Sequence, residues 1–79
     1  SSATQSVLRI LSGQEQRVLA LIAEGRTNKE VGQALGLAEK TVKNYLSNIF
    51  EKLHVSRRSQ AAALYARENR PGGAPSGPR

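Results

Sequence analysis

The sequence of 79 residues contains no cysteine and no aspartate, and its six acidic residues are all glutamates. Without cysteine there can be no disulfide and no thiolate metal site, which is consistent with a reducing cytosol. His54 is the only histidine, and no serine has a plausible base partner, so neither a catalytic triad nor a metal cluster can be assembled. We therefore expect no catalytic residue, no metal and no cofactor, and we place His54 on the surface near a helix end.

Long apolar runs are also missing from the sequence. No stretch approaches the roughly twenty apolar residues that cross a membrane, and the N-terminus lacks the charged and then apolar segments of an export signal. We expect a cytoplasmic protein without a membrane partner.

Positive charge is in excess. The sequence has 12 lysines and arginines against its six glutamates, a net charge of +6 and a pI near 10.6. Such a chain is attracted to polyanions, as nucleic-acid-binding proteins are. The length allows a single small domain, whose core must be compact and helical. We divide the chain into a linker (residues 1–10), a domain (11–68) and a Gly/Pro-rich tail expected to be disordered (69–79).

Two capping boxes mark the starts of the first two predicted helices. Ser12 and Glu15 have the spacing at which the serine hydroxyl accepts a backbone N–H and the glutamate reaches back to the serine. Thr27 and Glu30 repeat this pattern at the second helix. The first helix is expected to end at Gly25.

The centre of the domain has the pattern of a helix-turn-helix. Gly36 can adopt positive φ without steric cost, so it can end the second helix and redirect the chain into a third at about 39–53. Gly32 lies inside the second helix, where its missing side chain would let the third helix approach closely. A fourth helix is expected from an N-cap at Ser56 to about residue 68. The predicted fold is all-α, a four-helix bundle with a central helix-turn-helix and no wing.

The third predicted helix has two unlike sides at about 100° per residue. Its apolar side, expected to be buried, consists of Val42, Leu46, Ile49 and Leu53. A polar stripe on the opposite side consists of Lys40, Lys43, Asn44 and Ser47. Lysine can donate to guanine, asparagine can pair with adenine, and serine can bond either base or a phosphate, so we predict that the stripe contacts DNA bases. A plain helical hairpin with a solvated charged face is the competing interpretation.

These residues at these spacings resemble the LuxR/NarL (FixJ) type of DNA-binding domain, the C-terminal domain of response regulators and quorum-sensing activators. The resemblance covers about residues 11–66. The matching positions are Leu11-Ser12, Glu15, Val18-Leu19, Gly25, Thr27 to Glu30, Leu35, Thr41 to Asn44, Ile49, Lys52-Leu53, Val55, Arg57 or Arg58, and Ala61-Ala62. Within the family, the segment AEKTVKNY (38–45) is most similar to the DosR/DevR branch. Three residues depart from the family pattern: Ala38 stands where Ser often caps the recognition helix, Gly32 where Ala is usual, and Tyr45 where His is frequent.

The resemblance implies a bacterial transcriptional regulator that binds double-stranded DNA at inverted repeats as a dimer. Since the sequence has no aspartate, the phosphoacceptor of a receiver domain cannot lie in it. We expect an N-terminal receiver or sensor domain outside these residues, with a free-standing effector domain as the alternative. RNA polymerase is a further candidate partner.

Positions around the second and third helix N-termini and the corner before the fourth helix predict the phosphate contacts. They are Thr27, Asn28, Lys29, Thr41, Tyr45, Arg57 and Arg58. Small side chains and an aromatic residue on the fourth helix, together with the resemblance, predict the dimer interface. Its residues are Val55, Ala61, Ala62 and Tyr65. The same residues could instead close the core of a monomer.

Two other functions fit part of the pattern. A sigma-factor-like promoter-reading domain would use a similar helix-turn-helix on one asymmetric site, without a symmetric dimer. A basic protein-interaction module would bind an acidic protein and be indifferent to DNA sequence.

Overall fold

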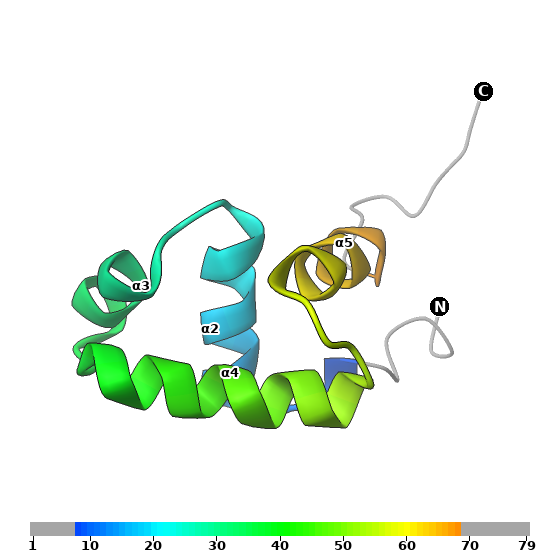
Figure 1. Ribbon diagram of the computed structural model, residues 1–79, viewed down its shortest axis with the longest axis horizontal. Helices are drawn as coiled ribbons and strands as arrows, with labels where there is room; N and C mark the ends of the chain where they lie inside the picture. The colour runs from blue at the N-terminus through cyan, green and yellow to red at the C-terminus, as the bar shows by residue number, and fades with distance from the viewer. Residues whose placement is uncertain (1–7, 69–79) are drawn as a thin grey trace.

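The computed structural model describes residues 8–68, which form four α-helices and no β-strand. The helices are α2 (Gly13–Ala23), α3 (Asn28–Leu35), α4 (Glu39–Leu53) and α5 (Arg58–Glu68), labelled as in Figure 1. The all-α class is confirmed. The predicted tail and the first seven residues of the predicted linker lie outside the described residues.

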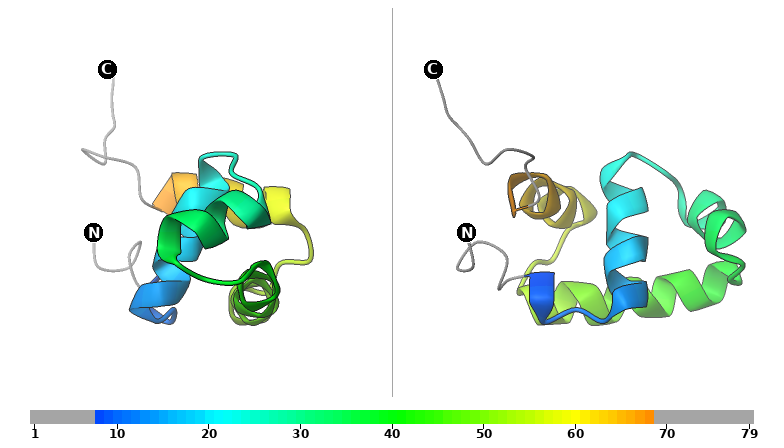
Figure 2. Two further views of the ribbon diagram at one scale, coloured as in Figure 1. Left: turned by 90° about the vertical axis from the view of Figure 1, so that its left-hand side faces the viewer. Right: turned by 180° about the vertical axis from the view of Figure 1, so that it is seen from behind.

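A single core holds the four helices together. α2 lies between α3 and α5 and contacts both of them as well as α4 (Figure 1). The view along α4 shows α2 and α3 on the same side of it (Figure 2, left). The largest fully buried side chains are Val18, Leu19, Val31, Val42 and Ile49. Burying one such side chain stabilises a fold by about 1.5–3 kcal/mol, so the contact among α2, α3 and α4 fixes the position of α4.

The packed region begins earlier than the predicted boundary at residue 11. Leu8 belongs to the core and is only 9% exposed. The Gln16 side-chain amide donates to the carbonyl oxygens of Leu8 at 3.0 Å and of Leu11 at 3.2 Å, which ties this segment to α2. Leu8 therefore packs with the domain although the predicted linker included it. Apolar residues also stand at positions 10 and 11, but so short a run does not show a helical period.

Both predicted capping boxes are present. Glu15 N donates to Ser12 Oγ at 3.1 Å and Ser12 N donates to Glu15 Oε1 at 2.8 Å. At α3, Glu30 N donates to Thr27 Oγ1 at 3.1 Å and Thr27 N donates to Glu30 Oε1 at 2.9 Å. These bonds satisfy backbone N–H groups that have no partner within the helix. Local sequence therefore determines where α2 and α3 begin.

The turn between α3 and α4 uses both glycines, one of them differently from the prediction. Gly36 ends α3 in the left-handed conformation, with φ 71° and ψ 34°, as expected. A Cβ on Gly32 would stand 2.5 Å from the Leu37 carbonyl oxygen but 3.6 Å from Val42 Cγ2, an ordinary contact. The missing side chain of Gly32 thus admits above all the backbone of the turn, and the predicted approach of α4 is an ordinary contact through Val42.

The two ends of α4 differ in how they are capped. Ala38 occupies the N-cap with extended backbone and makes no side-chain cap bond. His54 forms the C-cap in the left-handed conformation, with φ 57° and ψ 41°, and its side chain is exposed as predicted. A β-carbon in this conformation costs energy that glycine avoids. Each end therefore lowers the stability of α4.

α5 begins at Arg58, and the prediction of Ser56 as its N-cap was wrong. Ser56 N and Arg57 N both donate to Gln60 Oε1, at 3.0 and 3.1 Å. The Ser56 hydroxyl also donates to that oxygen, at 3.3 Å, instead of accepting a backbone N–H. Gln60 stands three residues after Arg57 and reaches back to its N–H, so a glutamine rather than the serine caps the helix.

A buried carboxylate joins α2 to α4. The Glu15 side chain is 6% exposed and accepts a hydrogen bond from Lys52 Nζ at 2.8 Å. Burial alone would raise the pKa of Glu15, but the bond from Lys52, the bonds with Ser12 and the charge of Lys52 outweigh it, so the pKa lies below its ordinary value. Lys52 is 43% exposed, and its hydration limits the strength of the pair.

Candidate nucleic-acid interface

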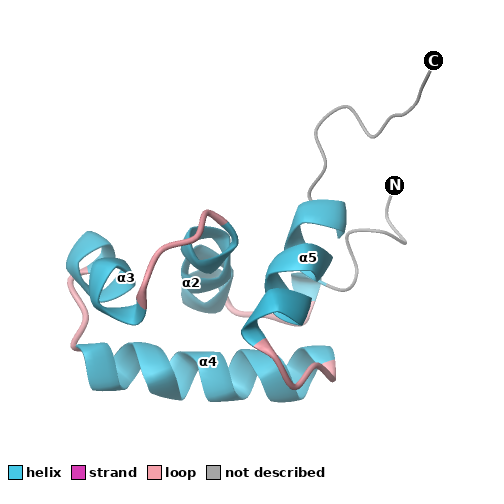
Figure 3. Cartoon of the chain, turned by 45° about the horizontal axis from the view of Figure 1, so that its top comes forward, coloured by secondary structure: helices cyan, strands magenta, loops and turns pink. Residues whose placement is uncertain are grey.

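The predicted stripe of base-contacting residues lies on the surface of α4. Its members Lys40, Lys43, Asn44 and Ser47 are all exposed. The buried residues of the same helix are Val42, Leu46, Ile49 and Leu53, as predicted. α2, α3 and α5 lie on one side of α4, which leaves the rest of its surface uncovered within the described domain (Figures 1 and 3). The stripe is therefore open to a partner as large as a DNA duplex.

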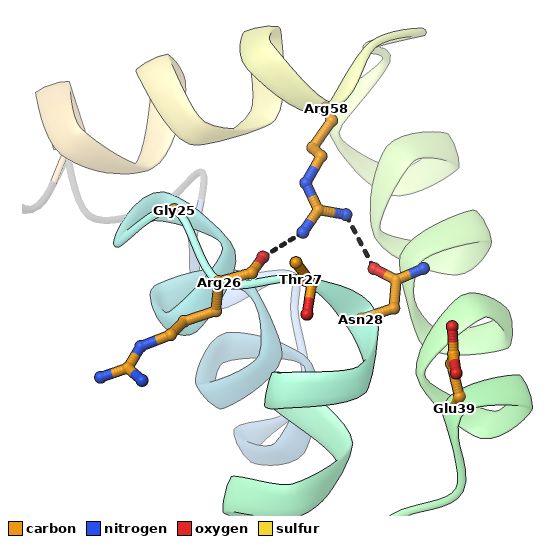
Figure 4. Close-up of a pocket in the computed structure, with 6 residues that line it drawn as sticks. All are labelled: Gly25, Arg26, Thr27, Asn28, Glu39 and Arg58. Atoms are coloured by element: carbon orange, nitrogen blue, oxygen red, sulfur yellow. Dashed lines mark hydrogen bonds between the residues drawn. The ribbon is translucent and has the colours of Figure 1, made fainter.

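Arg58 ties the start of α5 to the start of α3. Its Nη1 donates to Asn28 Oδ1 at 2.7 Å, and its Nη2 donates to the carbonyl oxygen of Arg26. Figure 4 shows the guanidinium facing these two acceptors, while the side chain of Arg26 points away from it. Arg58 is half-buried, whereas the neighbouring Arg57 is exposed. Two residues predicted as separate phosphate contacts are thus bonded to each other.

Two open clefts meet at Asn28 and Arg58, which line both of them. The first, of about 370 Å³, is completed by Gly25, Arg26, Thr27 and Glu39. The second, of about 270 Å³, is completed by Lys43, Leu46, Ser47 and Phe50. The structure therefore brings three predicted phosphate-contacting residues together with two members of the stripe.

The other predicted DNA-contacting residues do not line these clefts. Those with exposed side chains are Lys29, Lys40, Asn44 and Arg57. Thr41 and Tyr45 are half-buried, and Tyr45 packs against the core. Tyr45 therefore supports α4 from within the domain as well as reaching its surface.

The predicted dimer residues divide into two groups. Ala61 is 0% exposed and lies in the core of the monomer, so it cannot contact a second copy. The alternative that this residue closes the core is correct, because α5 packs closely against α2. Val55, Ala62 and Tyr65 are half-buried, so parts of their side chains reach the surface.

Other site chemistries find no support in the part of the chain that the structure describes. Residues 8–68 contain no group of three histidine, cysteine, aspartate or glutamate side chains that could hold a metal ion. None of the helices in this range has the length and apolar character that a bilayer span requires.

Residues 9–65 match the sequence profile of the LuxR family of bacterial regulatory proteins. The chain belongs to this family. The transcriptional regulatory protein LiaR of Bacillus subtilis (strain 168) is 52% identical over 59 residues, which are 75% of this chain and 28% of LiaR. The DNA-binding transcriptional activator DevR/DosR of Mycobacterium tuberculosis is 46% identical over 71 residues, 87% of this chain and 33% of that protein. The transcriptional regulatory protein DegU of Brevibacillus brevis is 48% identical over 54 residues, 68% of this chain and 23% of DegU.

Membership of the LuxR family makes this a helix-turn-helix DNA-binding domain of a transcriptional regulator, in a family that is not enzymatic. The similarity to DevR/DosR agrees with the resemblance of residues 38–45 to that branch. The chain spans between 23% and 33% of the length of these three LuxR-family relatives.

Several residues that line the clefts of this LuxR-family domain were not predicted as site residues, among them Glu39 and Arg26. Glu39 is exposed in the first turn of α4 and lies near Asn28 (Figure 4). An acidic residue in a first helical turn is favoured by the helix dipole, so the sequence did carry a signal for its place. The sequence carried no signal for the role of the Arg26 carbonyl, because every residue has the same backbone acceptor.

Proposed function

We propose that α4 enters the DNA major groove and reads base edges through its stripe, Lys40, Lys43, Asn44 and Ser47. The observation that carries this proposal is the exposure of all four side chains on a helix whose apolar residues are buried. Lysine donors suit the O6 and N7 acceptors of guanine, and the asparagine amide suits the donor and acceptor pair of adenine. Because α4 packs against the core through its buried side, the stripe is already displayed on the surface of the domain.

Phosphate contacts on either side of the groove would set the register of this helix. The residues proposed for them are Thr27, Asn28, Lys29, Thr41, Tyr45 and Arg57, whereas Arg58, predicted as another, bonds Asn28 and the Arg26 carbonyl. The α3 N-terminus supports this role, because its partial positive charge and the exposed Lys29 both attract an anion. Asn28 uses its oxygen for Arg58, so its NH₂ group supplies the donors for a phosphate.

Dimerisation is proposed through α5 and the residue before it, with Val55, Ala62 and Tyr65 in the contact. Their partial exposure supports this, since small side chains let two helices approach closely. A symmetric pair of recognition helices requires an inverted-repeat site. The distance between the two copies of α4 sets the spacing between its half-sites.

The whole protein is proposed to be a cytoplasmic response regulator with this domain as its effector. The chain spans about a third or less of its relatives, and a receiver or sensor domain would occupy the remainder. The receiver would carry the phosphoacceptor aspartate that this sequence lacks. RNA polymerase is the proposed partner at the promoter.

Selection of bound sites from a random duplex pool tests the DNA-reading proposal. The selection is made at about 150 mM salt, where weak nonspecific attraction to phosphates is reduced, with a parallel round without protein as background. We expect a short inverted repeat. An asymmetric motif would favour a sigma-factor-like domain and contradict the symmetric dimer, and no enrichment would favour a module that binds an acidic protein.

A further inference from the structure

The two acceptors of Arg58 flank a single residue, the N-cap of α3. Thr27 is that N-cap, and Arg58 bonds the carbonyl oxygen before it, on Arg26, and the side chain after it, on Asn28. α2 lies between α3 and α5 (Figure 1). The Arg58 side chain, at the start of α5, bonds Asn28 at the start of α3, which is 30 residues away in the sequence (Figure 4). The capping box orders α3 internally, and Arg58 fixes where its N-terminus stands relative to α5.

The chemistry of this bridge requires arginine. A guanidinium presents its N–H donors in a rigid planar fork and can bond two acceptors in different directions at once. A lysine ammonium carries the same charge on a flexible stem and does not reproduce that fork. Arg58 is also half-buried, in contrast to the exposed Arg57 beside it. The substitution Arg58→Lys therefore keeps the charge and removes the bridging geometry, so the effects of the two can be distinguished.

We propose that Arg58 is a positioning residue for DNA binding rather than one more phosphate contact. Its bridge holds the N-terminus of α3 in place, and this determines where Thr27 and Lys29 meet the DNA backbone. The inference rests on the proposed function, because it assumes that the α3 N-terminus faces a phosphate. It assigns Arg58 a different role from Arg57, although both are arginines at the same corner.

Amide hydrogen exchange in the free protein tests the bridge without DNA. We expect Arg58→Lys to speed exchange at Glu30 and Val31, whose N–H groups bond Thr27, by about threefold or more. Arg57→Lys is the matched control and should leave both rates unchanged. Equal rates in the parent and the Arg58→Lys protein would overturn the bridge.

Titration with a selected duplex tests the role in binding. Arg58→Lys keeps the charge, so we expect weaker binding with an unchanged salt dependence, whereas Arg67→Lys, at an exposed arginine of α5 to which no DNA contact is assigned, should bind as the parent does. In a double-mutant cycle, Arg58→Lys and Asn28→Ala should be non-additive by about two- to a hundredfold in Kd, because either change breaks the same bridge. Parent-like binding by Arg58→Lys, or additive losses, would overturn the proposal. A parent that binds no duplex would instead overturn the proposed function, and this role for Arg58 with it.

Discussion

Lys52 Nζ lies 2.8 Å from Glu15 Oε1, and this ion pair joins the last turn of α4 to the first turn of α2. The same carboxylate oxygen accepts the backbone N–H of Ser12. One buried side chain therefore caps α2 and holds α4 against it.

Replacing Glu15 by glutamine should destabilise the domain by about 1 kcal/mol at pH 7. The amide keeps an acceptor for Ser12 but loses the charge that pairs with Lys52, and the exposure of Lys52 keeps the loss moderate. Urea denaturation measures the change. Glu24→Gln is the matched control, because Glu24 pairs with Arg26 at the surface, where an ion pair contributes little.

The difference between the parent and Glu15→Gln should depend on pH. Since the folded-state pKa of Glu15 is lowered, its contribution is complete above the ordinary pKa of a glutamate in the unfolded chain and is lost as pH falls through the lower folded-state pKa. Repeating the denaturation in acid checks this expectation. A difference that stayed constant as the acid was increased would show that the charge of Glu15 is not what stabilises the fold.

Ala38→Ser should raise stability by about 0.5–2 kcal/mol. Ala38 already has the extended backbone of an N-cap but offers no acceptor, and a serine hydroxyl would accept a first-turn N–H of α4. Thermal denaturation measures the gain. Ala34→Ser is the control, because it adds the same hydroxyl at an exposed position within α3, where no cap is needed. An equal gain in stability from this control would refute the capping explanation.

His54→Gly should also stabilise the domain, by about 0.5–1 kcal/mol. The left-handed conformation of His54 costs about 1–2 kcal/mol for a residue with a β-carbon, and the extra freedom of glycine in the unfolded chain offsets part of the gain. His54→Ala keeps the β-carbon and should give no gain in the same thermal measurement. If alanine stabilised as much as glycine, the backbone conformation would not be the cause.

Lys29→Ala should weaken binding to all duplexes alike and lower the salt dependence of the logarithm of Kd by about one unit. The reason is that Lys29 is exposed beside the α3 N-terminus, where we propose that it meets a phosphate and no base. Titrations at several salt concentrations give the slope. Arg17→Ala, an exposed charge on α2, is the control; parent-like slopes for both variants would remove Lys29 from the phosphate contacts.

The parts of the fold set by local rules could be predicted from sequence. The boxes at Ser12 and Thr27 and the left-handed Gly36 depend on residues within a few positions, and all were found. Helical periodicity separated the exposed stripe from the buried side of α4 for a similar reason. The start of α5 was missed because a serine signals an N-cap wherever it stands, whereas here Gln60 accepts the N–H groups of Ser56 and Arg57 and the helix begins at Arg58.

The contacts that sequence could not give are those between distant residues. Nothing in the local pattern separates Arg58 from Arg57, yet only Arg58 meets Asn28 and the Arg26 carbonyl. Lys52 lies 37 residues from Glu15, and its pairing follows from how α2 and α4 pack. Ala61 looked like a surface residue suited to a dimer, and only the packed structure shows that it is buried where α5 packs against α2.

The most direct test of sequence reading by α4 is a titration of the parent and Lys43→Ala against a selected duplex and a shuffled duplex of equal length. Lys43 is exposed on the stripe and lines the cleft beside Asn28, so its loss should weaken binding to the selected site by about 1–3 kcal/mol. Binding to the shuffled duplex should change much less, and the ratio of the two affinities should fall. An unchanged ratio would contradict the proposal that this stripe reads DNA bases.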